Sequence, residues 1–213
     1  MEIQERLSGR RAQARRNDPL IRQAAREVFT ADPGAPMSAV AARAGVGISA
    51  LYRRYASKEA LLRQVAHDGL QQYLDVAEDA VADEREPWTA FTSFMERLLD
   101  AQTVAITMNL AGTFAPSQEL IDMSIRAAEL NARIIDRTKR GGGLRKDVVV
   151  DDLSLILEQV SSIRLGDERR TRELRQRYLR LFLDGIRATG SELPGPPPAP
   201  EELGLRWVPR QRA

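Results

Sequence analysis

The chain has 213 residues, a formal net charge of +2, one histidine and no cysteine. Without cysteine it forms no disulfide and no thiolate metal site, and a single histidine, His67, excludes a multi-histidine metal cage. We therefore expect neither a metal nor a cofactor. No apolar run approaches the roughly 20 residues of a membrane span, and the first residues lack the apolar stretch of a secretory signal. The expectation is a cytoplasmic protein that does not enter a membrane.

Basic residues concentrate near the N-terminus. Residues 1–63 contain 12 Lys and Arg against 6 Asp and Glu, a balance of +6, whereas the remaining residues have a balance of −4. A small basic head on a mildly acidic body points to a polyanion as the partner of the head. Charge alone leaves open the alternative of an uneven surface without a partner.

The predicted elements begin with a basic arm, residues 1–17. Its arginines either follow the minor groove of DNA or only keep the tail in solution. Asp18 and Pro19 then predict a helix start, with Asp as the N-cap and Pro at the first helical position. Apolar residues recur at helical spacing as far as Phe29, and Asp32-Pro33-Gly34 ends this helix.

Two short helices follow, from Pro36 to about Ala44 and from about Ile48 to Tyr55. Gly45 separates them, as a C′ glycine does, and small side chains on both helices allow a close crossing. A long helix followed by two short ones describes a helix-turn-helix unit. The unit spans about 36–55 within a head of residues 18–63, and a plain helical hairpin is the alternative interpretation.

Nearly everything after the head also has helical periodicity. We expect a helical body over residues 64–190 and a proline-rich tail over residues 191–213. The helix that reaches Arg140 carries two apolar stripes, which predicts that it lies between neighbours. Helices of this part of the chain are expected to begin at Ser57, Pro87, Val104, Pro116, Asp151 and Asp167.

The start of the third helix has the chemistry to enter the major groove of DNA. It offers backbone N–H groups and small side chains, and Tyr52, Arg54 and Lys58 follow at spacings that reach phosphates on either side. The alternatives are packing against the first helix for Tyr52 and a tolerated surface cation for Lys58. Arg53 is placed for a base edge or for the backbone. The candidate DNA-binding residues are Ser38, Gly47, Ile48, Ser49, Ala50, Tyr52, Arg53, Arg54 and Lys58.

The segments VAARAGV, residues 40–46, and LYRRYASKEAL, residues 51–61, resemble the signature of the TetR family of transcriptional regulators. The match covers about residues 18–66, and the GGGLRKDV break with the last helix resembles the SbtR-like C-terminal group. The resemblance implies an all-α fold of about nine helices. In it, a three-helix helix-turn-helix domain precedes a larger helical domain for ligand binding and dimerisation. It also implies a homodimer that binds double-stranded DNA at a near-palindromic operator.

Three positions depart from the family pattern. Gly47 stands where the family usually has Ser or Thr, Ser49-Ala50 where it often has Gly-Thr, and Arg54 where histidine is common. Loss of the threonine hydroxyl at Ala50 removes a phosphate or base contact, and Arg54 offers a fixed charge as a replacement. The operator sequence can therefore not be inferred from the residues that are usual in the family.

A ligand cavity is expected between the helices of the body. Its effector would be a mostly apolar small molecule with one or two hydrogen-bonding groups. Asn109 is the candidate anchor, because it interrupts an apolar run and needs a partner if it is buried. An ordinary filled core is the alternative. The candidate lining residues are Trp88, Phe91, Met95, Met108, Asn109, Phe114, Met123 and Gln159.

The last two helices of the body form the expected dimer surface, since both carry an apolar stripe and the TetR family dimerises through this pair. Two heads in such a dimer would read half-sites roughly 34–36 Å apart, about one turn of DNA. The candidate interface residues are Leu153, Ile156, Val160, Leu174, Tyr178, Leu181 and Phe182.

These features predict a DNA-binding transcriptional regulator, namely a repressor that a small ligand releases from its operator. A helical enzyme is disfavoured, because the chain lacks any nucleophile–base pair. Two further alternatives stay open. One is a ligand-independent regulator or an activator, and the other is a helical interaction module that does not bind DNA.

Overall fold

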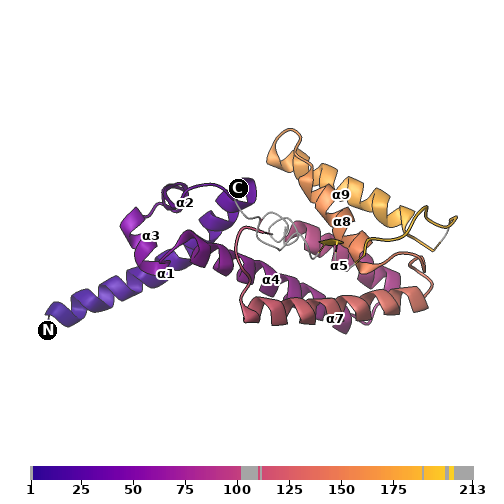
Figure 1. Ribbon diagram of the computed structural model, residues 1–213, viewed down its shortest axis with the longest axis horizontal. Helices are drawn as coiled ribbons and strands as arrows, with labels where there is room; N and C mark the ends of the chain where they lie inside the picture. Colours follow the sequence, from indigo (N-terminus) through magenta and orange to yellow (C-terminus); the bar gives the residue numbers. More distant parts are fainter. Residues whose placement is uncertain (1, 102–109, 111, 189, 200–201, 204–213) are drawn as a thin grey trace.

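The computed structural model describes residues 2–101, 110, 112–188, 190–199 and 202–203 (Figure 1), with side chains described from residue 17 onward. The described residues form an all-helical fold, as predicted, and their one β feature is an isolated bridge between Leu144 and Arg187. No helix within these ranges is long and apolar enough to cross a bilayer. The helices are α1 (Glu2–Ala31), α2 (Met37–Ala44), α3 (Ile48–Arg54), α4 (Lys58–Ala82), α5 (Pro87–Asp100), α7 (Gln118–Arg140), α8 (Val150–Ser162) and α9 (Glu168–Gly185).

The first helix is longer than predicted. Asp18 does not cap a new helix, because α1 continues through it with Pro19 inside. Proline removes one backbone hydrogen bond from a helix, but the residues before it are rich in Glu, Gln, Arg and Ala, which are strong helix formers. The predicted basic arm is therefore helical from Glu2, and Figure 1 shows it projecting away from the other helices.

Local capping explains where three later helices begin. Ser57, Ser117 and Asp167 each accept a hydrogen bond from the backbone N–H three residues ahead, at 3.1, 3.3 and 2.7 Å. Such caps satisfy N–H groups that have no partner inside the helix. These starts agree with the predicted ones to within a residue or two, whereas the helix predicted to begin at Val104 lies mostly outside the described residues.

Two apolar cores divide the molecule, and α4 runs through both. The head core joins α1, α2, α3 and the first half of α4, and the segment 110–120 also contributes to it. The body core joins the second half of α4 with α5, α7, α8 and α9. Phe29 and Leu51 are fully buried in the head, as Phe91 and Met95 are in the body. Figure 1 shows α4 extending from the head into the body, where it lies along α7.

Polar contacts connect the head to the body beside α4. Arg22 of α1 donates from Nη1 to both carboxylate oxygens of Asp68, each at 3.0 Å. Arg26, also on α1, donates to the backbone carbonyl of Ala101 at the end of α5. Burial lowers the pKa of Arg26, whereas the charge of Asp68 raises it. The first helix is thus bonded to α4 and to the end of α5, so a shift of either helix acts directly on the head.

The outer side of α7 is bare in the single chain. Ile121 and Ile125 are exposed, together with Ala128 and Ala132, although all four belong to the second apolar stripe predicted to contact a neighbour. The helix packs on α4, α5 and α8 with its other stripe and with Ile135, the last member of this one, and no described element covers the four exposed members. The prediction that α7 lies between neighbours is confirmed where it contacts α4, α5 and α8, whereas the part of the second stripe at Ile121 and Ile125 stays exposed in the single chain.

Candidate nucleic-acid interface

A left-handed glycine joins α2 to α3. Gly45 has φ 66° and ψ 30°, a region that residues with a Cβ rarely adopt. Its N–H donates to the carbonyl of Ala42 at 3.2 Å, and the N–H of Val46 donates to the carbonyl of Ala41 at 3.0 Å. These two bonds form a Schellman ending. The predicted role of Gly45 is confirmed, and the two short helices meet at a sharp turn.

One side of α3 packs into the head and the opposite side faces outward. Leu51 and the C-cap residue Tyr55 are buried, whereas Ile48, Tyr52 and Arg53 are exposed. Ile48 and Tyr52 are four residues apart and therefore lie on the same face of the helix. The structure thus brings three of the predicted DNA-binding residues onto one outer surface.

The other small predicted residues of the unit are also accessible. Ser38 is exposed in the first turn of α2, and Ser49 is exposed in the first turn of α3. Gly47 is exposed as the N-cap of α3, with open space where a Cβ would stand. Ala50 is half-buried. The absence of large side chains here leaves the start of α3 open to close approach by another molecule.

Asp18 holds the end of α3 against α1. Arg54 donates to this carboxylate from Nε at 2.6 Å and from Nη2 at 3.3 Å, and the Tyr55 hydroxyl donates to it at 2.9 Å. Burial raises the pKa of Asp18, but the hydrogen bonds from Arg54 and Tyr55 outweigh burial and lower the pKa overall. Burial and the bond to Asp18 raise the pKa of Tyr55 above its usual range.

This contact changes the interpretation of Arg54. The sequence assigns Asp18 to a helix cap and Arg54 to a phosphate, and nothing local links two residues 36 positions apart. The structure places the guanidinium of Arg54 on the Asp18 carboxylate, so a phosphate would have to compete with an existing ion pair. The role that the structure gives Arg54 is therefore to hold α3 in place through Asp18, and not to contact a phosphate.

Arg53 differs from the other cations of the head. Arg43 pairs with Glu27 at 2.5 Å, and Nζ of Lys58 lies 5.3 Å from the centre of the Phe29 ring. Arg53 is exposed and has neither an ion pair nor a hydrogen bond to any residue whose side chain the structure describes. Its charge is thus available to an outside anion at the outer face of α3.

The predicted ligand residues do not all meet in one place. Trp88, Phe91 and Met95 are buried in the body core. Phe114 instead packs in the head core, because the segment that carries it turns back over the head, and this corrects its assignment to a body cavity. Gln159 is exposed, so it does not line an internal cavity either. Of the rest, Met123 is half-buried against the body core, and Met108 and Asn109 lie outside the described residues.

A small cavity lies inside the body core between α4, α5, α7 and α8. Its volume is about 30 Å³, and Met95 lines it. The hydroxyl of Tyr73 donates to Oδ1 of Asn131 at 2.7 Å in its wall, and burial raises the pKa of Tyr73 to about 12. Sequence reasoning missed this polar pair. The available signal was an asparagine at position 131, one residue from each of the two apolar stripes of α7.

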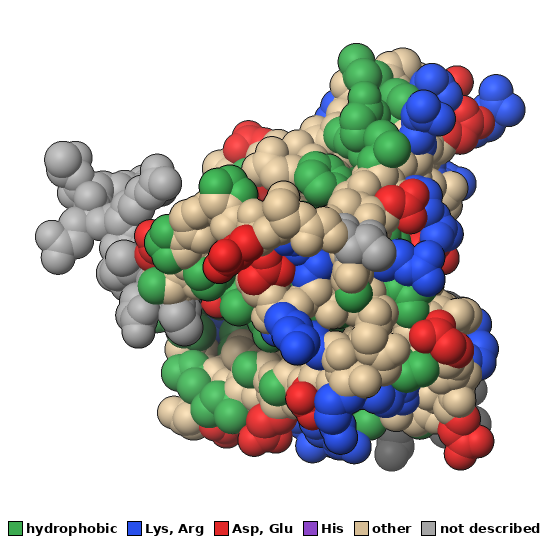
Figure 2. Space-filling view, turned by 90° about the vertical axis from the view of Figure 1, so that its right-hand side faces the viewer, with side chains coloured by type: hydrophobic (Ala, Val, Ile, Leu, Met, Phe, Trp, Pro, Cys, Tyr) green, Lys and Arg blue, Asp and Glu red, His purple; other side chains and the backbone are tan. Residues whose placement is uncertain are grey.

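The outer face of α9 is apolar. Tyr178, Leu181 and Phe182 are exposed and follow one another at helical spacing. Leu153 and Val160 of α8 are instead buried in the core of their own chain, so they are not on a surface that a second chain would meet. Figure 2 shows hydrophobic side chains gathered beside Lys and Arg on the upper part of the molecule, which α8 and α9 form. The half-buried members of the predicted set are Ile156 and Leu174.

Two family models match the chain. Residues 21–65 match the bacterial regulatory proteins of the tetR family, and residues 86–188 match the C-terminal domain of SbtR-like transcriptional regulators. The chain belongs to the TetR family. It is therefore a DNA-binding transcriptional regulator and not an enzyme. The TetR match ends inside α4 at residue 65, next to Ala66, the last α4 residue of the head core.

Solved TetR-family structures share the fold. A TetR transcription regulatory protein from Mycobacterium vanbaalenii is 27% identical with a TM-score of 0.54, covering 83% of this chain and 98% of that one. The ketosteroid transcriptional regulator KstR2 of Mycobacterium tuberculosis is 20% identical with a TM-score of 0.61, covering 81% and 95%. CprB from S. coelicolor A3(2) is 16% identical with a TM-score of 0.62, covering 83% and 91%. No curated protein matched the sequence.

Proposed function

We propose that this TetR-family protein is a cytoplasmic, homodimeric repressor of a near-palindromic operator with half-sites roughly 34–36 Å apart. The observation that carries the proposal is the outer face of α3, where Tyr52 is exposed beside Arg53, which has no ion pair among the residues whose side chains are described. An arginine in the major groove donates two hydrogen bonds to a guanine edge, and a tyrosine hydroxyl donates to a phosphate. These two residues supply base readout and positioning from a single helix.

The apolar face of α9 supports the dimer. Tyr178, Leu181 and Phe182 are exposed in a single chain, and a second copy of α9 would cover them. Burial of apolar surface contributes about 25 cal/mol per Å² before the cost of association. Dimerisation through this face would fix the separation of the two heads, which is what a pair of half-sites requires.

The proposed effector is a mostly apolar small molecule that enters the body core beside Tyr73 and Asn131. The cavity there, about 30 Å³, is close to the size of one water and far below the roughly 300–1,000 Å³ of small-molecule sites. An effector would therefore bind a body conformation with separated helices, shifting the heads out of register with the operator. KstR2, which has the same fold, is described as a ketosteroid transcriptional regulator, and ketosteroids belong to this chemical class.

Operator binding is tested by incubating the purified protein with fragments of genomic DNA from its source organism and sequencing the fragments that it binds. Selected sequences are then compared with random DNA in gel shifts at several salt concentrations. We expect fragments with two related half-sites, bound with an affinity that falls steeply as salt rises, because each neutralised phosphate releases counterions. Equal affinity for all sequences, or no binding at low salt, would contradict the proposal.

A melting screen with an apolar compound library tests the effector. A compound that binds the folded state raises the melting temperature by mass action, and it should also release the selected operator. Asn131→Leu should change this response, whereas Gln159→Leu, which alters an exposed polar residue of α8, should not. A protein that no compound stabilises would support the ligand-independent alternative.

A further inference from the structure

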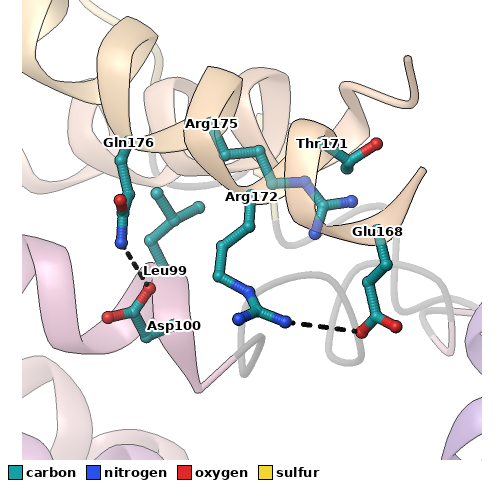
Figure 3. A pocket seen from close by; sticks show the side chains of 7 residues that line it. All are labelled: Leu99, Asp100, Glu168, Thr171, Arg172, Arg175 and Gln176. Carbon is teal, nitrogen blue, oxygen red and sulfur yellow. Dashed lines mark hydrogen bonds and ion pairs between the residues drawn. The ribbon is translucent and has the colours of Figure 1, made fainter. Parts of the chain in front are cut away.

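A second and larger cavity opens between the end of α5 and the start of α9 (Figure 3). Its volume is about 450 Å³, within the range of small-molecule sites. It shares no described lining residue with the small cavity of the body core. The described lining residues are Leu99 and Asp100 of α5 and Glu168, Thr171, Arg172, Arg175 and Gln176 of α9.

Two of the four charged side chains of this cavity compensate each other. Nη2 of Arg172 lies 3.8 Å from Oε1 of Glu168. Asp100 and Arg175, by contrast, form no ion pair with any residue of the described part of the chain. Asp100 accepts only a long hydrogen bond, 3.5 Å, from Gln176. Within the described part of the chain, Asp100 and Arg175 are thus the two charged groups of this cavity that lack an ion pair, although the charge of Glu168 acts on Arg175 from nearby.

Arg175 is held at the wall of the cavity. Its Nε donates to the backbone carbonyl of Ile163 at 3.2 Å, and its two terminal nitrogens have no acceptor among the described residues. Burial lowers the pKa of Arg175 and the nearby Arg164 lowers it further, whereas the charge of Glu168 raises it without restoring the ordinary value. A bound carboxylate would offset this unfavourable environment, because it accepts two parallel hydrogen bonds from a guanidinium.

Asp100 is also in an unfavourable place for its charge. It is the last residue of α5, where the negative end of the helix dipole opposes a carboxylate. Figure 3 shows Asp100 and Arg172 extending from their two helices into the same space. An ammonium group bound there would neutralise the carboxylate and the end of the helix, and the charge of Arg172 is turned toward Glu168, its ion-pair partner.

We propose that this cavity binds a small zwitterion, with its carboxylate on Arg175 and its ammonium group on Asp100. An α-amino acid is the simplest molecule of this class. The site is separate from the apolar effector cavity of the proposed function. Because α9 also carries the exposed face of Tyr178, Leu181 and Phe182, a zwitterion that joins α5 to α9 would stabilise the position of that face.

Thermal melting of the full chain with each of the twenty protein amino acids tests the proposal, followed by calorimetric titration of those that raise the melting temperature. We expect at least one to stabilise the protein at millimolar concentration. The N-acetylated form of that amino acid lacks the ammonium group, and the corresponding decarboxylated amine lacks the carboxylate. Each of the two compounds should therefore bind at least about tenfold more weakly. No stabilisation by any amino acid, or equal binding of the blocked forms, would overturn the proposal.

Variants locate the site. Arg175→Gln and Asp100→Asn should each weaken binding about tenfold or more, whereas Arg169→Gln changes an exposed arginine of α9 outside the lining and should leave it unchanged. Asp100 is exposed, so its variant keeps the test valid if Arg175→Gln fails to fold. If Asp100→Asn and Arg169→Gln bind the amino acid with equal affinity, the assignment of the binding site to this cavity is refuted. Binding is measured without DNA, so failure here leaves operator binding standing, and failure of operator binding leaves this result standing.

Discussion

The outer faces of α3 and α9 both expose large apolar or aromatic side chains, yet their charges are arranged differently. On α3, Tyr52 lies next to Arg53, which has no partner among the described residues. On α9, Leu181 lies next to Arg180, which pairs with Glu96 of α5 at 2.8 Å. Arg177 beside Tyr178, by contrast, has no ion pair among the described residues. An uncompensated cation suits a polyanion, whereas a continuous apolar face suits another protein surface. Apolar content also separates the two surfaces, because Tyr178, Leu181 and Phe182 form one continuous exposed face on α9, whereas small residues stand beside Tyr52 and Arg53 at the start of α3.

The largest expected effect comes from placing charge on the α9 face. Leu181→Glu with Phe182→Glu should give monomers, because carboxylates buried in an apolar interface lack partners. Operator affinity should fall more than about 100-fold, since a single head binds one half-site without the second. Light scattering and gel shifts measure the two effects.

The outer side of α7 offers a matched control for that variant. Ile121 and Ile125 are 40% and 55% exposed, the same fractions as Phe182 and Leu181. The double change Ile121→Glu and Ile125→Glu should leave the dimer and its DNA affinity intact. If the α7 control is monomeric, or if the α9 variant is still dimeric, the assignment of the dimer interface to α9 is wrong.

Loss of the exposed cation of α3, Arg53, should have the next largest effect. Arg53→Ala removes a contact to a base or a phosphate, worth about 1–3 kcal/mol, so operator affinity should fall about 5- to 150-fold. Arg43→Ala, in which the lost arginine is paired with Glu27, should have a smaller effect. Titration of labelled operator measures both. If Arg43→Ala costs as much as Arg53→Ala, pairing does not decide which arginine meets DNA.

The hydroxyl of Tyr52 should contribute less than the charge of Arg53. Tyr52→Phe keeps the ring, which is 50% exposed, and removes one hydrogen bond worth about 0.5–1.5 kcal/mol. We expect roughly 2- to 10-fold weaker binding, similar for all DNA sequences, because a phosphate contact carries no base information. An unchanged affinity in Tyr52→Phe with a loss in Tyr52→Ala would assign the ring to packing.

The smallest expected effect concerns the ion pair that positions α3. The lowered pKa of Asp18 means that the pair stabilises the head above the ordinary value of 3.8 and that this stability is lost as pH falls through the lowered pKa. Asp18→Asn should therefore cost about 1 kcal/mol at pH 7, a drop of roughly 2–4 °C in melting temperature. The difference from wild type should disappear once the pH falls below the lowered pKa of Asp18.

An exposed carboxylate provides the comparison for this last variant. Asp136→Asn, which breaks a surface pair with Arg140, should change the melting temperature by less, because exposed pairs contribute little. A difference between Asp18→Asn and wild type that persists at the acid end would show that Asp18 acts by shape and not by charge.

Sequence reasoning was most successful where the physical cause is local. Gly45 ends α2 because only a residue without a Cβ adopts its backbone angles without strain. Ser57 and Ser117 begin α4 and α7 because their hydroxyls accept from N–H groups three residues ahead. The exposed face of α3 likewise follows from its helical period, since Leu51 must face the core and Tyr52 then faces outward.

The chain by itself therefore determined the helix-turn-helix unit, the family and the later helices that the structure describes, because their signals lie within a few residues, whereas the Asp18-Pro19 signal did not start α1. Only the tertiary structure decided that Arg54 is held by Asp18 and Arg53 is not, since that contact joins residues 36 positions apart. It also decided that Phe114 packs in the head and that Leu153 is buried within its own chain. A helical period says which residues share a face, but the neighbour that covers a face comes from distant parts of the chain.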